Sequence, residues 1–289
     1  MINDFTYLKP GTVKEALSML SDHVDECKIV CGGQSLLIPM RQGLLVTEYL
    51  IDIKGLNELS YIKYDAKEGL KLGATTTHRL IEKSDVIKKY YPVLAVMEER
   101  LASVQTRNWG TIGGNLAHGD AAGDPAPVLI TLGAQVKVAS AKGERTVPVE
   151  TFYTDIFESV MEHDEMIVEI QIPPMPAKTA AAYTKFNLLK NDMGVVGVGV
   201  SITVDANGTC KDARIALGNA AVTPIRATNA EKVLIGKKLT DALFAEAGEA
   251  AAAECDPVSD IHASEEYRRH LIKVLTKRMA KKAFEQASK

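Results

Sequence analysis

One stretch, residues 108 to 133, constrains the fold of this chain more than any other, because it holds more glycine and small polar residues than an ordinary core accepts. We expect a loop here that holds a ligand and then leads into a short helix. For that helix, Asp124 is a suitable N-cap, Pro125 a suitable first residue and Gly133 a suitable end.

The glycines of this stretch indicate the kind of ligand. Gly110, Gly113 and Gly114 allow positive φ angles and carry no Cβ, so successive backbone N–H groups can converge on an anion. Thr111 and Asn115 can add side-chain hydrogen bonds. The pattern therefore favours a phosphate-bearing ligand.

A second stretch, residues 28 to 37, has the same character. A short β-branched run ends at Gly32 and Gly33, and Gln34 and Ser35 follow at the turn, as expected where a strand leads into a backbone anion site. A single Gly-Gly pair most often marks a tight turn, but the two stretches together indicate ligand binding. Neither has the spacing of a Rossmann fingerprint or a P-loop.

Length and composition exclude several classes of protein. A chain of 289 residues is long enough for two domains, and 46% hydrophobic residues, 25% charged residues and a net charge of −3 are typical of a soluble globular protein. No basic excess indicates nucleic-acid binding. Because no apolar run of about eighteen residues and no signal-peptide pattern is present, we expect a cytoplasmic protein without a transmembrane segment.

The four cysteines do not form a metal-binding or disulfide pattern. Cys27, Cys31, Cys210 and Cys255 are scattered and include no C-x-x-C pair, so neither a zinc site nor an iron–sulfur cluster is expected. Buried free thiols are the favoured interpretation. Asp120 and Asp124 could form a metal-binding pair, but further ligands are missing from the sequence, and we expect no metal in this chain.

Periodicity and turn residues predict two α/β lobes and a third unit. The first lobe, to about residue 55, has a helix over 12–20 and strands at 28–31 and 49–53. The second lobe has a hairpin at 61–64 and 69–73, helices from about 77 to 89 and from 93 to 101, and strands at 135–139, 145–149 and 166–172.

Three prolines in residues 173 to 176 resist both helix and central strand and predict a domain boundary. Beyond them we expect three antiparallel strands and then three helices. The strands are predicted at 181–189, 195–204 and 210–218, and the helices at about 227–234, 240–254 and 264–286.

The two glycine stretches resemble those of a known family. Gly32 to Ser35 and Thr111 to Asn115, about eighty residues apart and followed by Gly123-Asp124-Pro125, resemble the FAD-binding (medium) subunit of molybdenum hydroxylases, the group of carbon monoxide and xanthine dehydrogenases. The resemblance covers essentially the whole chain. It implies an α+β protein with a two-lobed PCMH-type (vanillyl-alcohol-oxidase-like) FAD-binding domain at 1–175, with lobes of about 1–55 and 56–175. A C-terminal domain at 177–289, with a three-stranded antiparallel sheet and a helical bundle, follows.

The resemblance also implies which residues contact FAD. Ile167 is expected near the adenine and Lys185 beside the flavin, although a solvated strand position is an equal alternative for Lys185. Met193 stands where several relatives carry an aromatic residue that shields the flavin, which leaves that shielding open. The full set of expected FAD-binding residues is Lys28, Ile29, Val30, Cys31, Gly32, Gly33, Gln34, Ser35, Leu36, Leu101, Thr111, Ile112, Gly113, Gly114, Asn115, Asp124, Ile167 and Lys185.

By the same resemblance, this chain relays electrons and does not itself oxidise the substrate. Its expected partners are a small [2Fe–2S] subunit and a large molybdenum-cofactor subunit, in a dimer of heterotrimers, with FAD passing electrons to an external acceptor. The sequence identifies neither the substrate nor the acceptor, and no catalytic residue is expected in this chain.

Two alternatives stay open at this point. A self-contained flavin oxidase would need a substrate base within the chain, but the C-terminal unit is small for that purpose and no His–Tyr–Arg cluster is recognisable. A flavin-storage or nucleotide-sensing module is the non-enzymatic alternative. His118, the histidine beside the ligand loop, either contacts the flavin or caps the turn, and the structural role is favoured.

Overall fold

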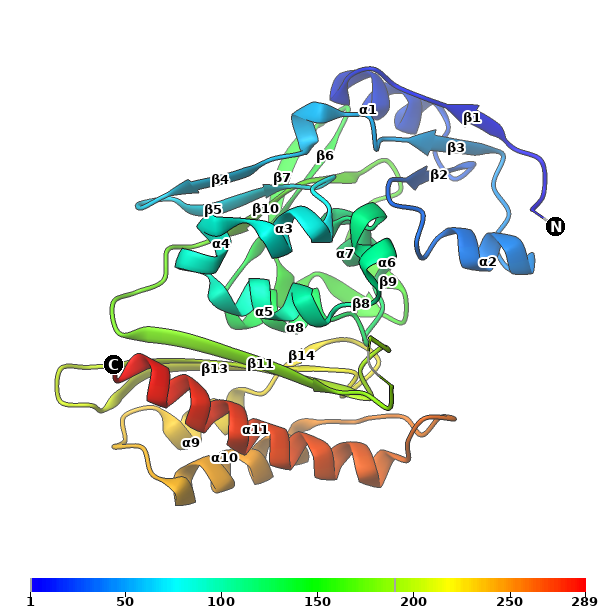
Figure 1. The fold of residues 1–289 in the computed structure, drawn as a ribbon. Coiled ribbons are helices and arrows are strands. Elements are labelled where there is room, and N and C mark those ends of the chain that lie inside the picture. The colour runs from blue at the N-terminus through cyan, green and yellow to red at the C-terminus, as the bar shows by residue number, and fades with distance from the viewer. Residues whose placement is uncertain (1, 190) are drawn as a thin grey trace.

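Three main β-sheets follow one another along the chain and stack from one end of the molecule to the other (Figure 1). The computed structural model describes residues 2–189 and 191–289. In these residues the strand orders are β1-β3-β2, β4-β5-β10-β6-β7 and β11-β12-β13-β14, with a small β8-β9 ribbon beside the second sheet.

The first lobe is a small parallel sheet with β3 as its central strand. Thr12 caps α1 by accepting a hydrogen bond from the N–H of Glu15, and Ala16 and Leu20 are its buried residues. The strand β1 and the helix α2 were not predicted from the sequence. The elements are β1 (Thr6–Leu8), α1 (Val13–Asp22), β2 (Cys27–Val30), α2 (Leu37–Gln42) and β3 (Tyr49–Asp52).

The second lobe joins an antiparallel five-stranded sheet to a group of short helices. Its strands are β4 (Ile62–Asp65), β5 (Gly69–Gly73), β6 (Gln135–Ser140), β7 (Gly143–Pro148) and β10 (Met166–Ile172), and its ribbon is β8 (Tyr153–Asp155) with β9 (Glu158–Ser159). Its helices are α3 (His78–Lys83), α4 (Asp85–Tyr90), α5 (Pro92–Arg100), α6 (Val104–Trp109), α7 (Ile112–His118) and α8 (Pro125–Thr131), and the 3-10 turns are η1 (Asn57–Leu59) and η2 (Val149–Thr151).

The glycine-rich stretch differs from its prediction in one respect. Most of residues 108 to 118 belong to α6 and α7 and not to a loop, and Thr111 caps α7 by accepting a hydrogen bond from the N–H of Gly114. The predicted helix after it is present as α8. Asp124 occupies its N-cap position, but its side chain makes no capping hydrogen bond.

The C-terminal unit consists of an antiparallel sheet with helices packed on one face. All nine residues of β12 are buried, because α8 of the second lobe and α11 both pack against this strand. A two-residue fourth strand, β14, adds to the three that were expected. The elements are β11 (Thr179–Phe186), β12 (Val196–Val204), β13 (Cys210–Gly218), β14 (Ile225–Arg226), α9 (Thr228–Leu234), α10 (Asp241–Glu254) and α11 (Glu265–Ala287).

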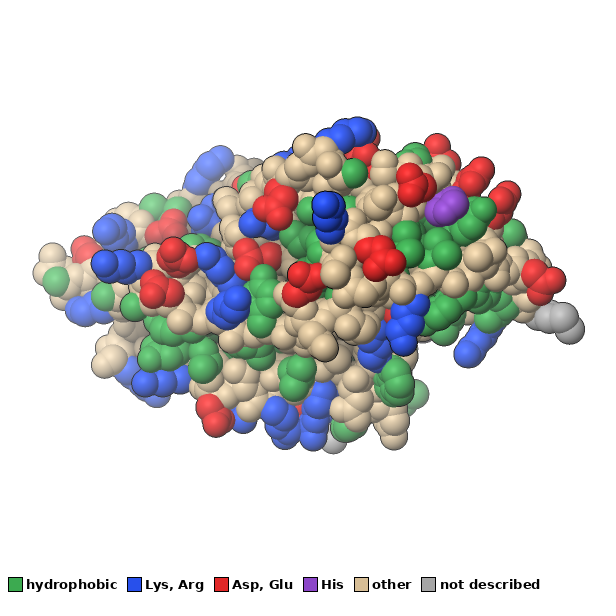
Figure 2. Space-filling view, turned by 90° about the horizontal axis from the view of Figure 1, so that it is seen from above, with side chains coloured by type: hydrophobic (Ala, Val, Ile, Leu, Met, Phe, Trp, Pro, Cys, Tyr) green, Lys and Arg blue, Asp and Glu red, His purple; other side chains and the backbone are tan. Residues whose placement is uncertain are grey.

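The face of the molecule that carries α1 and β1 has no large patch of a single charge among its described residues. Figure 2 views the molecule from above Figure 1, from the side of α1 and β1, and shows acidic, basic and hydrophobic side chains intermixed. This face therefore offers no basic stripe of the kind that binds nucleic acid.

Candidate functional site

The first glycine segment, residues 31 to 36, presents a row of unused hydrogen-bond donors. It leaves the end of the parallel strand β2, and Gly33 turns it with a φ of +66°. Within the described part of the chain, none of the five backbone N–H groups from Gly32 to Leu36 donates to a protein acceptor. Since buried or half-buried N–H groups are normally satisfied, consecutive free donors on a turned backbone are suited to an anion such as a diphosphate.

The second segment uses its N–H groups differently from the prediction. The N–H of Ile112 donates to the carbonyl of Thr76, and the N–H of Gly113 donates to the carbonyl of Ala74. These donors are therefore not free for an anion. A Cβ on Gly113 would lie 2.7 Å from Ala74, so this glycine serves close packing. Gly114 is exposed, and a Cβ there would meet only the hydroxyl of its own cap, Thr111, so its outer side is open to a ligand.

The two segments touch each other. A Cβ on Gly32 would lie 2.5 Å from the carbonyl oxygen of Trp109 and 2.6 Å from the Cα of Gly110. A Cβ on Gly110 would in turn lie 3.5 Å from Gln34 and 3.1 Å from His78. Only glycine allows this approach, so the segments form one site although they are distant in sequence.

Asp124 and Lys185 form a buried ion pair between α8 and β11. The Lys185 ammonium lies 2.6 Å from Oδ2 of Asp124, and the hydroxyl of Tyr183 donates to Oδ1 at 2.6 Å. Lys185 is only 6% exposed, which rules out the solvated position considered above. Burial raises the pKa of the Asp124 carboxyl, while Lys185 and Tyr183 oppose that rise. Such a pair fixes the start of α8 against the C-terminal sheet, because a buried charge without its partner is costly.

The remaining predicted residues are less tightly gathered. Lys28, Ile29 and Val30 lie in β2, and Lys28 is exposed. Leu101 and Ile167 are buried in the hydrophobic core of the second lobe. Asn115 is half-buried, and a Cβ on Gly123 would lie 3.2 Å from the Oδ1 of Asn115. Met193, between β11 and β12, is 59% exposed. Contact of these residues with FAD stays a prediction.

His118 and the cysteines have structural surroundings. The ring of His118 packs against Phe157 at 5.0 Å between centroids, and burial lowers the pKa of His118. The four cysteines are free thiols, and in the residues that the structure describes no group of three or more metal-binding side chains comes together.

A network of buried charges lies behind the second segment. Nδ1 of His78 lies 3.1 Å from Oε1 of Glu98, which is fully buried, and Glu82 bonds Arg107 at 2.9 Å. Nothing in the sequence marked these residues. For Tyr183 and Lys54 the sequence does hold an indication of a role at the site. Tyr183 lies two residues from Lys185 in the same strand, so both side chains are on one face of the sheet. Lys54 closely follows the end of a buried parallel strand, where ligands commonly bind.

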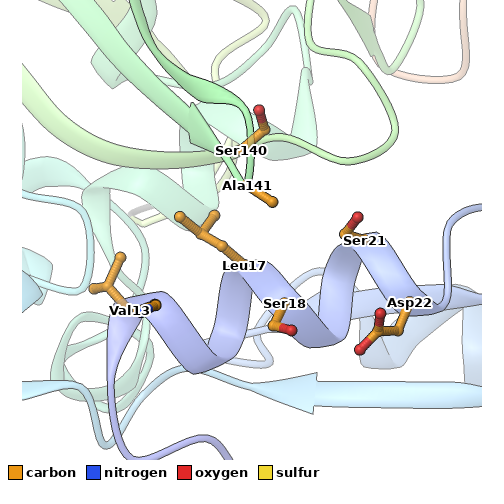
Figure 3. A pocket seen from close by; sticks show the side chains of 8 residues that line it. Val13, Leu17, Ser18, Ser21, Asp22, Ser140 and Ala141 are labelled. Carbon is orange, nitrogen blue, oxygen red and sulfur yellow. The ribbon is translucent and has the colours of Figure 1, made fainter.

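The pocket in Figure 3 is separate from this site. It has a volume of about 380 Å³ and lies between α1 and the β6–β7 turn, lined by Val13, Lys14, Leu17, Ser18, Ser21, Asp22, Ser140 and Ala141. None of these residues belongs to the glycine segments. The pocket therefore takes no part in the candidate site.

The fold and the site define a protein suited to binding a phosphate-bearing ligand: two α/β lobes with a row of free N–H donors where they meet. Comparisons with known proteins agree. Residues 3–175 match the family model described as the FAD binding domain in molybdopterin dehydrogenase, and residues 181–283 match the CO dehydrogenase flavoprotein C-terminal domain.

Individual relatives match over almost their whole length. The 6-hydroxypseudooxynicotine dehydrogenase complex subunit alpha of Paenarthrobacter nicotinovorans is 34% identical, with 98% of this chain and 95% of the relative covered. The carbon monoxide dehydrogenase medium chain of Hydrogenophaga pseudoflava is 32% identical, with 95% of each covered. A solved structure of carbon monoxide dehydrogenase from that organism, which lacks the Mo-pyranopterin moiety of its molybdenum cofactor, superimposes with a TM-score of 0.95 at 32% identity over 99% of each chain.

This chain therefore belongs to the FAD-binding medium subunits of the molybdenum hydroxylases, as its glycine motifs indicated. The α+β fold class, the FAD-binding domain and the assignment to oxidoreductase subunits of the carbon monoxide and xanthine dehydrogenase type are confirmed. Among the described residues, no helix is both long and apolar enough to span a membrane.

Proposed function

We propose that this chain is an electron-transfer subunit. It holds FAD between its first two lobes, takes electrons from a small [2Fe–2S] subunit served by a large molybdenum-cofactor subunit, and passes them to an external acceptor. The observation that carries this proposal is the row of free N–H groups from Gly32 to Leu36 in contact with the second glycine segment. The names of the relatives, a complex subunit and a medium chain, support the presence of partners.

The residues of the chain have separate tasks in this proposal. The N–H groups of Gly32 to Leu36 bind the diphosphate, and the open side of Gly114 leaves room for it. The pair of Asp124 and Lys185 fixes α8 beside the site. Bound FAD would supply the redox chemistry, since the protein contributes position and electrostatics.

The site is open to an approaching partner. Gln34 and Gly114 are exposed, and Trp109, whose carbonyl contacts Gly32, is 57% exposed. An electron donor on another subunit can therefore come near the site without a rearrangement of the core. We propose a dimer of heterotrimers in the cytoplasm, with 1–175 as the FAD-binding domain and 177–289 as the C-terminal domain.

The substrate is proposed to be decided by the large subunit. The two relatives named above belong, by their names, to dehydrogenases of 6-hydroxypseudooxynicotine and of carbon monoxide, yet each is about one-third identical to this chain. A medium subunit that relays electrons needs no substrate pocket of its own.

Anaerobic reduction tests the relay. The FAD-loaded chain alone should keep its visible absorption when offered the substrate of the complex, and should bleach with dithionite. Adding both partner subunits should allow the substrate to bleach the flavin, and omitting only the [2Fe–2S] subunit should prevent this. If the isolated chain oxidised an alcohol, amine or aldehyde with dioxygen at roughly 1 per second or faster, the self-contained oxidase would replace the relay.

A further inference from the structure

Lys54 lies at the end of the parallel sheet from which the first glycine segment emerges. In the β2–β3 register, Val30 lies opposite Asp52. Two residues beyond this pair, the chain has reached Gly32 after β2 and Lys54 after β3. Because parallel strands end at the same edge, Lys54 stands beside the free N–H groups of the glycine segment.

The indole ring of Trp109 packs against the end of the Lys54 side chain. The Lys54 ammonium lies 3.5 Å from the centroid of the indole ring, which is a cation–π contact. The carbonyl of the same Trp109 is the group that touches Gly32. The ammonium is thus held where the two glycine segments meet.

The ammonium has no hydrogen-bond acceptor in the described part of the chain, although its nitrogen is buried. The Asp52 carboxylate, which acts electrostatically on Lys54, accepts hydrogen bonds from the hydroxyl of Tyr7 and from the backbone N–H of Lys54 itself. Burial lowers the pKa of Lys54, while Cys31 and Asp52 oppose that shift. A buried cation normally has a bonded partner, so a missing anionic partner is the simplest account of this position.

We propose that the Lys54 ammonium binds the diphosphate of FAD together with the N–H groups of Gly32 to Leu36, and that Trp109 holds the ammonium in place. The N–H groups supply directed hydrogen bonds, whereas the ammonium supplies the full positive charge that a row of backbone dipoles lacks. This inference rests on the FAD site and not on the proposed path of the electrons. A chain that binds FAD through Lys54 but is not reduced by its partners would refute only the relay.

Ligand titration of the FAD-free full chain tests the inference. Trp109 is the single tryptophan, so its fluorescence reports ligands at the site directly. Lys54→Gln should weaken the binding of both FAD and ADP about tenfold to hundredfold, the range of a charge-assisted hydrogen bond. The affinity should also become less sensitive to salt, because one ionic contact is lost. Lys54→Arg should restore most of the affinity.

The matched control is Lys63→Gln. Lys63 also lies over an aromatic ring, that of Tyr61 at 4.4 Å, but on the exposed surface of β4. Its replacement should leave both affinities within about twofold of the parent chain. The inference is overturned if Lys54→Gln leaves ADP affinity unchanged, or if affinity falls while its salt dependence stays that of the parent, since the lysine would then act only through the fold.

Discussion

At the scale of single residues, the glycines of the site do different work although they look alike in sequence. Gly32 and Gly113 allow backbones to touch, Gly33 provides a positive φ, and Gly114 leaves the exposed side of α7 without a side chain. The motif predicts a glycine-rich anion site, and the free N–H groups of Gly32 to Leu36 support that prediction. It could not show which N–H groups are free, because the acceptors Ala74 and Thr76 lie more than thirty residues away.

Gly33 gives the first test at this scale. Gly33→Val should yield a folded but colourless protein, since a β-branched residue strongly disfavours a φ of +66° and the free N–H groups would no longer converge. We expect FAD affinity to fall at least tenfold by absorbance titration. Gly33→Asn should retain more of it, because asparagine tolerates this conformation.

Gly43→Val separates backbone strain from ligand binding. Gly43 has a similar φ of +71° and open space around it, but lies beyond α2. This variant should bind FAD like the parent chain. Full FAD occupancy in Gly33→Val would contradict the role given to the first glycine segment.

At the scale of elements, the buried ion pairs behind the site join α3 to α6. Glu82 of α3 accepts from Arg107 at 2.9 Å and from Arg79 at 2.7 Å, and Arg107 also donates to the carbonyls of Leu101 and Ala102. These contacts hold the end of α5 to α6, the helix that presents Trp109 and Gly110. The position of the second glycine segment therefore depends on Glu82.

This arrangement predicts an acid-sensitive contribution to stability. Burial tends to raise the pKa of Glu82, but the hydrogen bonds from Arg79 and Arg107 outweigh it and leave the pKa below 4.5. A carboxylate whose pKa is lowered by folding stabilises the folded state at pH values above its pKa in the unfolded chain. It loses that effect as the pH falls through its pKa in the folded chain. The contribution of Glu82 should thus be complete at pH 7 and decline below pH 4.5.

Urea unfolding at pH 7 and at pH 4 and below measures this contribution. Glu82→Gln should cost about 3 kcal/mol at pH 7, because Arg107 loses its buried partner, and the difference from the parent should shrink in acid. Glu68→Gln, at an exposed carboxylate in the β4–β5 turn, serves as the control and should cost less than about 1 kcal/mol. A Glu82→Gln penalty that is constant with pH would contradict the ionised state.

The elements also show where sequence-based prediction ends. The long strands β10 to β13 and the helices α10 and α11 were predicted to within a few residues because their periodic burial is local. Helix α7 was missed because Gly113 and Gly114 disfavour helix by propensity, while contact with Ala74 stabilises it from outside. Asp124 was expected to cap α8, but Lys185 and Tyr183, about sixty residues away, bind its carboxylate instead.

At the scale of the whole molecule, the proposed FAD site lies between two lobes whose hydrophobic cores are only partly shared. The first lobe has a small core of its own, which it shares with Ala139, Met166 and Val168 of the second sheet. The C-terminal unit has a larger core built from its sheet and helices. The family model of the FAD binding domain matches residues 3–175, which contain the first two lobes, so the cofactor should stabilise the molecule unevenly.

Removing FAD should therefore loosen one region and spare another. A ligand that binds only the folded state stabilises it by about 2.7 kcal/mol when free ligand is a hundredfold above its Kd. Hydrogen exchange of the full chain with and without FAD should show faster exchange in the FAD-free form over 27–42 and 109–115, where the two glycine segments lose the anion between them. Peptides from β12, which is buried on both faces, should exchange at equal rates in both forms and serve as the internal control. Equal protection of the two glycine segments with and without FAD would mean that the cofactor does not bind between them. A uniform loss of protection over the whole chain on removal of FAD would mean that the lobes and the C-terminal unit unfold as one cooperative body.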